Sequence, residues 1–148
     1  MNFLFLGGCG VKSTVVDMSR FGQMYLDEGV FDSRRILSKA SVRTLTANHN
    51  TGLPLAYHNG GIFDPAWGLG WNMGSKKDDA GMLRSASSFE HGGFGCVKLL
   101  CDPQVDIVAA FFTVSIEDNY PYSALRIPRF NIAFFTMNHG CKLYWNQH

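Results

Sequence analysis

The sequence predicts an α+β fold in which helices precede an antiparallel β-meander. The first third of the chain holds two stretches with apolar residues at helical spacing. The region 67–114 instead holds short apolar runs separated by turn residues, as expected of consecutive antiparallel strands. The chain has 148 residues, which is enough for one domain with a buried core.

The first helix is expected over residues 14–28. Thr14 is followed three residues later by Asp17, the spacing of a capping box at a helix N-terminus. Apolar residues such as Phe21 then recur at helical spacing, and Gly29 is a natural stop. We interpret the apolar stripe of this helix as core packing.

A second helix is expected over residues 39–47, with Ser38 as its cap and Val42 facing inward. A polar turn at 32–35 separates the two helices. The stretch 48–65 is rich in Asn, Gly, Pro and His, and we predict a long loop there.

The second half of the sequence predicts the meander. Strands are expected over residues 67–73, 88–94, 97–101 and 107–114. Asp102-Pro103-Gln104 marks a turn between the last two. The remaining residues from Ser115 onward follow no pattern that assigns them to an element.

Composition narrows the classes of function. Thirteen Lys and Arg against twelve Asp and Glu give a net charge of +1, so charge provides no argument for a nucleic-acid partner. No apolar run reaches the ~18 residues of a membrane span. The apolar start, Met1–Cys9, lacks a basic stretch, and we interpret it as a strand or turn entry rather than a targeting segment.

The sequence offers no metal or cofactor motif. The four cysteines, at positions 9, 96, 101 and 141, form no C-x-x-C pair, and no His, Asp and Glu cluster has metal-ligand spacing. We expect neither a metal nor a cofactor. The disulfide state of the cysteines stays open.

The segment Glu90–Gly95 is the strongest candidate for chemistry. His91 is followed by two glycines, which let a ligand approach the backbone closely, and a strand edge there offers N–H groups to an oxyanion. The alternative is a histidine in a tight β-turn. Another alternative is a small hydrolase that pairs His91 with one of the nearby serines Ser85, Ser87 and Ser88.

Five segments occur in an order that suggests a family. They are Ser13–Phe21 with Gly29, Arg35–Ser38, Trp67–Trp71, Glu90–Gly95 and Asp102–Val108. Together they resemble the serine β-lactamase superfamily, and most closely the class C-like branch with its D-alanyl-D-alanine carboxypeptidases and esterases. The resemblance implies that residues 1–115 form the C-terminal part of a β-lactamase/transpeptidase-like fold, with 116–148 as a tail of unassigned structure.

The resemblance also implies roles for particular residues. His91-Gly92-Gly93 is similar to the family's K-T-G element in its H-x-G variant. His91 would hold the substrate carboxylate or join the proton network, and Gly92 and Gly93 would keep the strand open to substrate. The backbone N–H of Phe94 would stabilise the oxyanion.

Two aromatic residues are expected at the wall of the substrate site. These are Trp71 and Tyr57, again through the resemblance. Tyr57-His58-Asn59 has the letters of the family's Y-x-N element, but here it follows the first helix, whereas the family's element precedes it. We interpret that match as a coincidence.

The implied reaction is acyl-enzyme hydrolysis of an amide or ester, for instance a β-lactam, a D-Ala peptide or a carboxylic ester. The family's nucleophile element, S-x-x-K, occurs nowhere in this sequence. We therefore expect a C-terminal fragment that is inactive alone. The alternative is a non-catalytic truncated paralogue that serves as a binding or assembly module.

Partners and compartment follow only from the resemblance. The full-length protein would take a small-molecule ester, β-lactam or peptide. Strand edges and apolar faces that the rest of the family's fold covers would be exposed here, so self-association is expected. Family members are often periplasmic or secreted, and the sequence shows no export signal that would place this chain.

Overall fold

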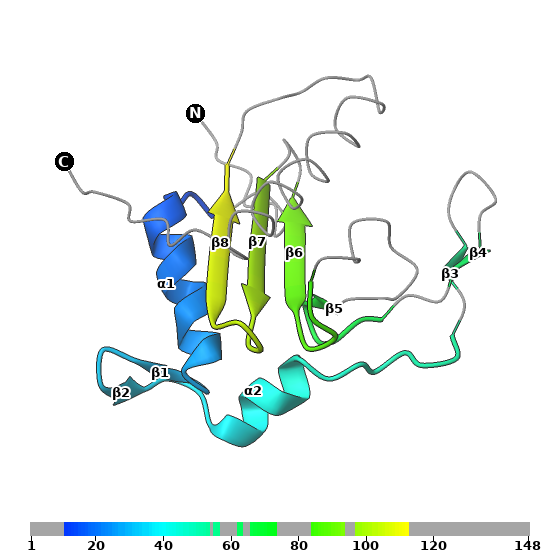
Figure 1. The fold of residues 1–148 in the computed structure, drawn as a ribbon, viewed down its shortest axis with the longest axis horizontal. Helices are drawn as coiled ribbons and strands as arrows, with labels where there is room; N and C mark the ends of the chain where they lie inside the picture. The colour runs from blue at the N-terminus through cyan, green and yellow to red at the C-terminus, as the bar shows by residue number, and fades with distance from the viewer. Residues whose placement is uncertain are drawn as a thin grey trace, which may run out of the picture.

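A computed structural model describes residues 11–53, 55–56, 62–63, 66–73, 84–93 and 97–112. Helix α1, a short hairpin of β1 and β2, and helix α2 come first, and the other antiparallel strands follow (Figure 1). The helices are α1 (Val15–Leu26) and α2 (Lys39–Leu45). The strands are β1 (Val30–Phe31), β2 (Arg34–Arg35), β3 (Leu55–Ala56), β4 (Ile62–Phe63), β5 (Asn72–Met73), β6 (Phe89–Gly93), β7 (Val97–Asp102) and β8 (Ile107–Phe111). The predicted α+β order is confirmed.

Helix α1 begins and ends close to the predicted residues. Thr14 is the N-cap, and its Oγ1 accepts from the Asp17 backbone N–H at 3.1 Å while donating to the Asp17 carboxylate at 2.9 Å. The acid thus bonds the cap hydroxyl, whereas in a capping box it would reach the cap's own N–H. At the other end Gly29 has φ +91° and its N–H reaches the Met24 carbonyl at 2.8 Å, which closes the helix.

Of the polar turn predicted at 32–35, only Asp32 and Ser33 form a turn, at the tip of a small hairpin, whereas Arg34 and Arg35 form strand β2. Strands β1 and β2 pair antiparallel, with Val30 opposite Arg35. Asp32 and Ser33 connect them with φ +48° and +62°. Two consecutive positive φ angles are typical of a two-residue hairpin loop, because they match the right-handed twist of the flanking strands. The sequence predicted the turn but not the two strands beside it.

Helix α2 has Ser38 as N-cap, as expected, and its Oγ accepts from the Ser41 N–H at 2.9 Å. Val42 is buried in the core. The helix ends at Leu45, two residues earlier than the sequence indicates. The predicted loop after it contains a short antiparallel pair, β3 with β4, that sequence reasoning missed.

The expected strand over 67–73 is wrong for most of its length. Only Asn72 and Met73 form a strand, and an isolated β-bridge pairs Asn72 with Trp67. The chain turns in between: Gly70 has φ +89°, and the Gly68 N–H donates to the Trp71 carbonyl at 2.8 Å. The glycines of this stretch therefore form a turn within the expected strand.

The four-stranded sheet is the predicted meander. Its order is β5-β6-β7-β8, and every neighbouring pair is antiparallel. In the β6–β7 ladder Phe89 lies opposite Cys101 and His91 opposite Leu99. Helix α1 packs against β7 and β8, beside the sheet in Figure 1.

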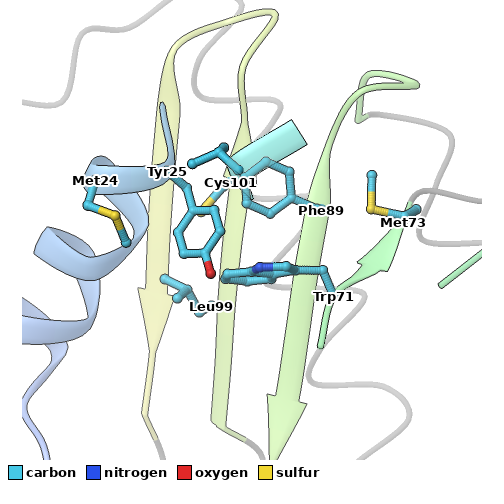
Figure 2. Packing of buried hydrophobic residues seen from close by; sticks show 8 residues of the cluster. Met24, Tyr25, Trp71, Met73, Phe89, Leu99 and Cys101 are labelled. Carbon is cyan, nitrogen blue, oxygen red and sulfur yellow. The ribbon is translucent and has the colours of Figure 1, made fainter. Parts of the chain in front are cut away.

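An aromatic cluster fills the space between α1 and one face of the sheet (Figure 2). The Trp71 ring meets Tyr25 at 5.0 Å and Phe89 at 4.8 Å between centroids, both edge to face. Such aromatic pairs add to the stabilisation from buried area. Leu99 and Cys101 complete this core from β7. The cluster holds α1, the 66–73 turn and the sheet together.

Candidate functional site

A pocket of about 700 Å³ opens beside the aromatic core. This volume is typical of small-molecule sites. Helix α1, the 66–73 turn and the strands β6 and β7 provide most of its lining. Apolar side chains on its walls are Val11, Met18, Phe21, Tyr25, Leu69, Trp71, Val97, Leu99 and Phe112. The site therefore suits a ligand, or another protein segment, with substantial apolar surface.

His91 lies at this pocket with its side chain exposed. It stands on β6 opposite Leu99, and side chains opposite each other in a ladder share a face of the sheet. Its imidazole meets the Trp67 ring edge to face, with centroids 6.0 Å apart and an interplanar angle of 75°. His91 is thus on a strand, held from one side and accessible from the other, and not in a tight turn.

The two glycines after His91 differ in whether the surrounding space would admit a side chain. A Cβ at Gly93 would lie 2.7 Å from Cγ2 of Val97, so a side chain there forces a shift. A Cβ at Gly92 would have its nearest contact at 3.7 Å, on the Val97 carbonyl oxygen, so space alone does not demand glycine. Both glycines line the pocket, and their lack of side chains leaves the β6 backbone accessible there.

The neighbouring strand leaves this part of β6 open. Strand β5 pairs with β6 only at Phe89 and Glu90. Within the described residues, the three positions 91–93 therefore have a strand neighbour on the β7 side alone. On that side, no described strand takes up the backbone hydrogen-bonding groups of these three residues.

Trp71 lines the pocket but is itself 4 % exposed. Its indole stacks near Phe21, with centroids 6.2 Å apart and planes 21° apart. The ring therefore packs in the core as well as lining the pocket. The predicted site residues Tyr57 and Phe94 lie outside the described residues.

Hydrogen bonds fix the turn that presents Trp67 and Trp71. The Leu69 N–H donates to the Leu45 carbonyl at 2.9 Å, at the end of α2. Asn50 accepts the Trp67 N–H at 2.8 Å through Oδ1. A Cβ at Gly68 would stand 2.3 Å from the Leu45 carbonyl oxygen, so this approach needs glycine. Helix α2 thus positions one wall of the pocket.

A buried charge cluster lies on the opposite face of the sheet. Glu90 Oε2 is 2.6 Å from Nη1 of Arg84 and 2.8 Å from Nζ of Lys98. The three side chains are between 1 % and 9 % exposed. The contacts are close charge–charge approaches rather than well-aligned hydrogen bonds. Sequence reasoning missed this cluster, because its members are separated along the chain and each is of a type usually found at the surface.

The nearby serines are engaged elsewhere than with His91. Ser85 donates its hydroxyl to the buried Asp102 carboxylate, which also accepts the Ser85 backbone N–H at 2.9 Å. Ser87 lies 2.9 Å from Ser85, hydroxyl to hydroxyl. Ser88 is fully buried, with no hydrogen-bond partner for its hydroxyl among the described residues. No hydrogen bond within that part of the chain joins His91 to any of them, which disfavours a Ser–His hydrolase built from these residues.

Cys101 is the one cysteine that the structure describes, and its thiol is free and fully buried. Burial raises the pKa of Cys101 to about 12. The neutral thiol therefore dominates at neutral pH, and it acts as a small apolar core residue.

Among the described residues, no group of His, Cys, Asp and Glu side chains is arranged to hold a metal ion. No helix in that part of the chain is both long and apolar enough to cross a membrane.

Comparison with known proteins identifies the family. The family model described as β-lactamase matches residues 3–121. The fold is similar to the crystal structure of a novel penicillin-binding protein homologue from Caulobacter crescentus, with a TM-score of 0.52 and 21 % sequence identity. The alignment covers 66 % of this chain and 24 % of that one, so the chain spans about a quarter of its structural relative. No curated protein matches the sequence. Because the family match extends over most of its length, the chain belongs to the β-lactamase family.

Proposed function

We propose that this chain is the C-terminal part of a serine hydrolase of the β-lactamase family. It carries one wall of the active site and is inactive alone. The observation that supports this most is the accessible His91-Gly92-Gly93 segment at an apolar pocket, in a sequence without S-x-x-K. The coverage of about a quarter of a penicillin-binding protein homologue supports the fragment interpretation.

In the complete enzyme, a serine hydroxyl from outside this chain would attack the substrate carbonyl and form a tetrahedral oxyanion. Backbone N–H groups of the β6 region, that of Phe94 among them, would stabilise that charge. The His91 imidazole would donate to a substrate carboxylate or take part in proton transfer. Collapse of the oxyanion would expel the amine or alcohol and leave an acyl-enzyme, which water hydrolyses. The substrate class is an amide or ester.

The first test is an intact-mass measurement after treatment with a serine-reactive fluorophosphonate. We expect no stoichiometric adduct on the chain alone. The protein must be shown to be folded in the same sample, by a narrow native charge distribution. A single adduct that disappears in His91→Ala would mean that a nucleophile is present, and would overturn the proposal.

A second candidate is a non-catalytic module that kept this lobe for binding or assembly. The same observation, a substrate wall in a sequence without S-x-x-K, motivates it. Sedimentation and denaturant unfolding discriminate the two. A stable monomer that unfolds cooperatively favours the module, and aggregation relieved by a co-expressed N-terminal part of the fold favours the fragment.

Large apolar side chains around the pocket make self-association the expected behaviour of the isolated chain. Phe21 is 44 % exposed, Leu69 53 % and Val11 85 %. Contiguous apolar surface of this kind marks interaction sites or aggregation liabilities. Sedimentation at several concentrations measures it directly.

A further inference from the structure

We propose that the buried Arg84–Glu90–Lys98 cluster is a clamp that positions the His91–Gly93 backbone from the reverse face of the sheet. Glu90 immediately precedes His91 on β6, and Lys98 stands opposite Gly92 on β7. The Glu90–Lys98 contact therefore crosses the ladder diagonally at the point where the candidate site begins. The importance of that backbone rests on the proposed function, whereas the clamp itself can be measured without it.

The register assigns the clamp and the site to opposite faces. Side chains alternate along a strand, and paired residues share a face. His91 and Leu99 form one pair, on the face that α1 covers. Glu90 with Leu100, and Gly92 with Lys98, form pairs on the other face. The charge contacts of the clamp thus form on the reverse face of the sheet, although Lys98 is also one of the residues that line the pocket.

The glycines explain why β6 needs support here. At most positions of a ladder, cross-strand side-chain pairs stabilise the pairing. Gly92 and Gly93 have no side chains to contribute, and glycine loses more conformational freedom on folding than other residues. Strand β5 does not extend along this stretch either. Lys98, at the position facing Gly92, reaches instead toward Glu90, two residues back along β6.

Burial makes the clamp sensitive to change. A carboxylate in contact with two cations is stable away from water only while its partners remain. The side chain of Lys98 is 5 % exposed and that of Glu90 9 %. Removing the Lys98 ammonium takes away the charge contact between β6 and β7. Glu90 then keeps its contact with Arg84, which precedes β6 in the chain, but no longer contacts a charged group on β7.

Hydrogen exchange of the full chain, read by mass spectrometry, tests the proposal. In Lys98→Met we expect exchange at residues 91–93 to accelerate by at least about tenfold, while β7 residues 99–101 and the β8 strand change much less. Lys98→Arg should restore most of the protection, because a cation returns to Glu90. Lys39→Met, the same substitution at an exposed ion pair, is the matched control and should leave β6 unchanged.

Two results would overturn the clamp. One is equal acceleration throughout β6, β7 and β8, which would show general support of the sheet and not positioning. The other is unchanged exchange at 91–93. If Lys98→Met fails to fold, Glu90→Gln is measured in its place, and loss of folding in both variants also assigns the cluster to general stability. None of these measurements involves catalytic turnover. The clamp proposal can therefore be refuted while the proposed function stands, and the proposed function can be refuted while the clamp proposal stands.

Discussion

Gly22 of α1 lies so close to Val108 of β8 that a Cβ at Gly22 would stand 2.6 Å from Cγ1 of Val108. The same Cβ would lie 3.0 Å from Sγ of Cys101. This contact sets the distance between the helix and the sheet. A glycine in a helix interior costs about 1 kcal/mol relative to alanine, so here close packing outweighs helix propensity.

Gly22→Ala is therefore expected to destabilise the protein by about 1–3 kcal/mol, although alanine is the better helix former. Denaturant unfolding measures it. The double variant Gly22→Ala/Val108→Ala should recover part of the loss, because it removes the methyl that the new Cβ meets. An increase in stability in the single variant would contradict the close packing.

Trp71→Ala removes the ring that joins Tyr25, Phe21 and Phe89. The expected loss is about 3–5 kcal/mol of unfolding free energy, the range for a buried aromatic residue. Leu69→Ala, on the same turn but 53 % exposed, is the control and should change stability by less than about 0.5 kcal/mol. Similar losses in both variants would mean that the indole is not central to the core.

Cys101 should resist alkylation in the folded chain. Its pKa of about 12 leaves almost no thiolate at pH 8, and its side chain is inaccessible. Iodoacetamide followed by peptide mass spectrometry should show modification of Cys101 only after denaturant is added. Because folding raises this pKa, the stability it contributes is complete below the thiol's ordinary range and declines as pH rises above about 9. Cys101→Ala should lack that alkaline decline.

Glu28 links the end of α1 to α2. A hydrogen bond from Lys39 lowers the pKa of Glu28, and the charges of Lys39 and Arg43 act in the same direction. A lowered folded-state pKa stabilises the protein above the ordinary carboxyl range, and this contribution disappears as pH falls below it. When the pH is lowered from 5 to 3, the urea concentration at the midpoint of unfolding should therefore decrease slightly less in Glu28→Gln than in the parent chain. A steeper fall in the variant would contradict the sign.

The sequence predicted the elements that depend on interactions between residues close together in the chain. Thr14 and Ser38 cap their helices as expected, because a capping hydroxyl needs only the next three residues. The order of β6, β7 and β8 followed from apolar runs and the turn at Asp102–Gln104. Asp102 Oδ1 accepts the Gln104 N–H at 3.1 Å there, a bond within the turn itself.

What the sequence did not predict depends on contacts between distant residues. The 67–71 stretch looks like a strand, but α2 binds its backbone and bends it. The charges of Arg84, Glu90 and Lys98 look like surface residues until the register brings them together. His91 was identified as a candidate from its glycine neighbours, whereas its contact with Trp67 required the fold.

The packing of α1 on β7 and β8 has a consequence for synthesis. The helix ends at Leu26, and the strands that bury it begin at Val97, more than 70 residues later. At ~5–20 residues per second, the ribosome needs several seconds to supply them. During that time Met24 and Tyr25 have no sheet to cover them. The apolar face of the nascent helix therefore stays uncovered until β7 and β8 have been synthesised.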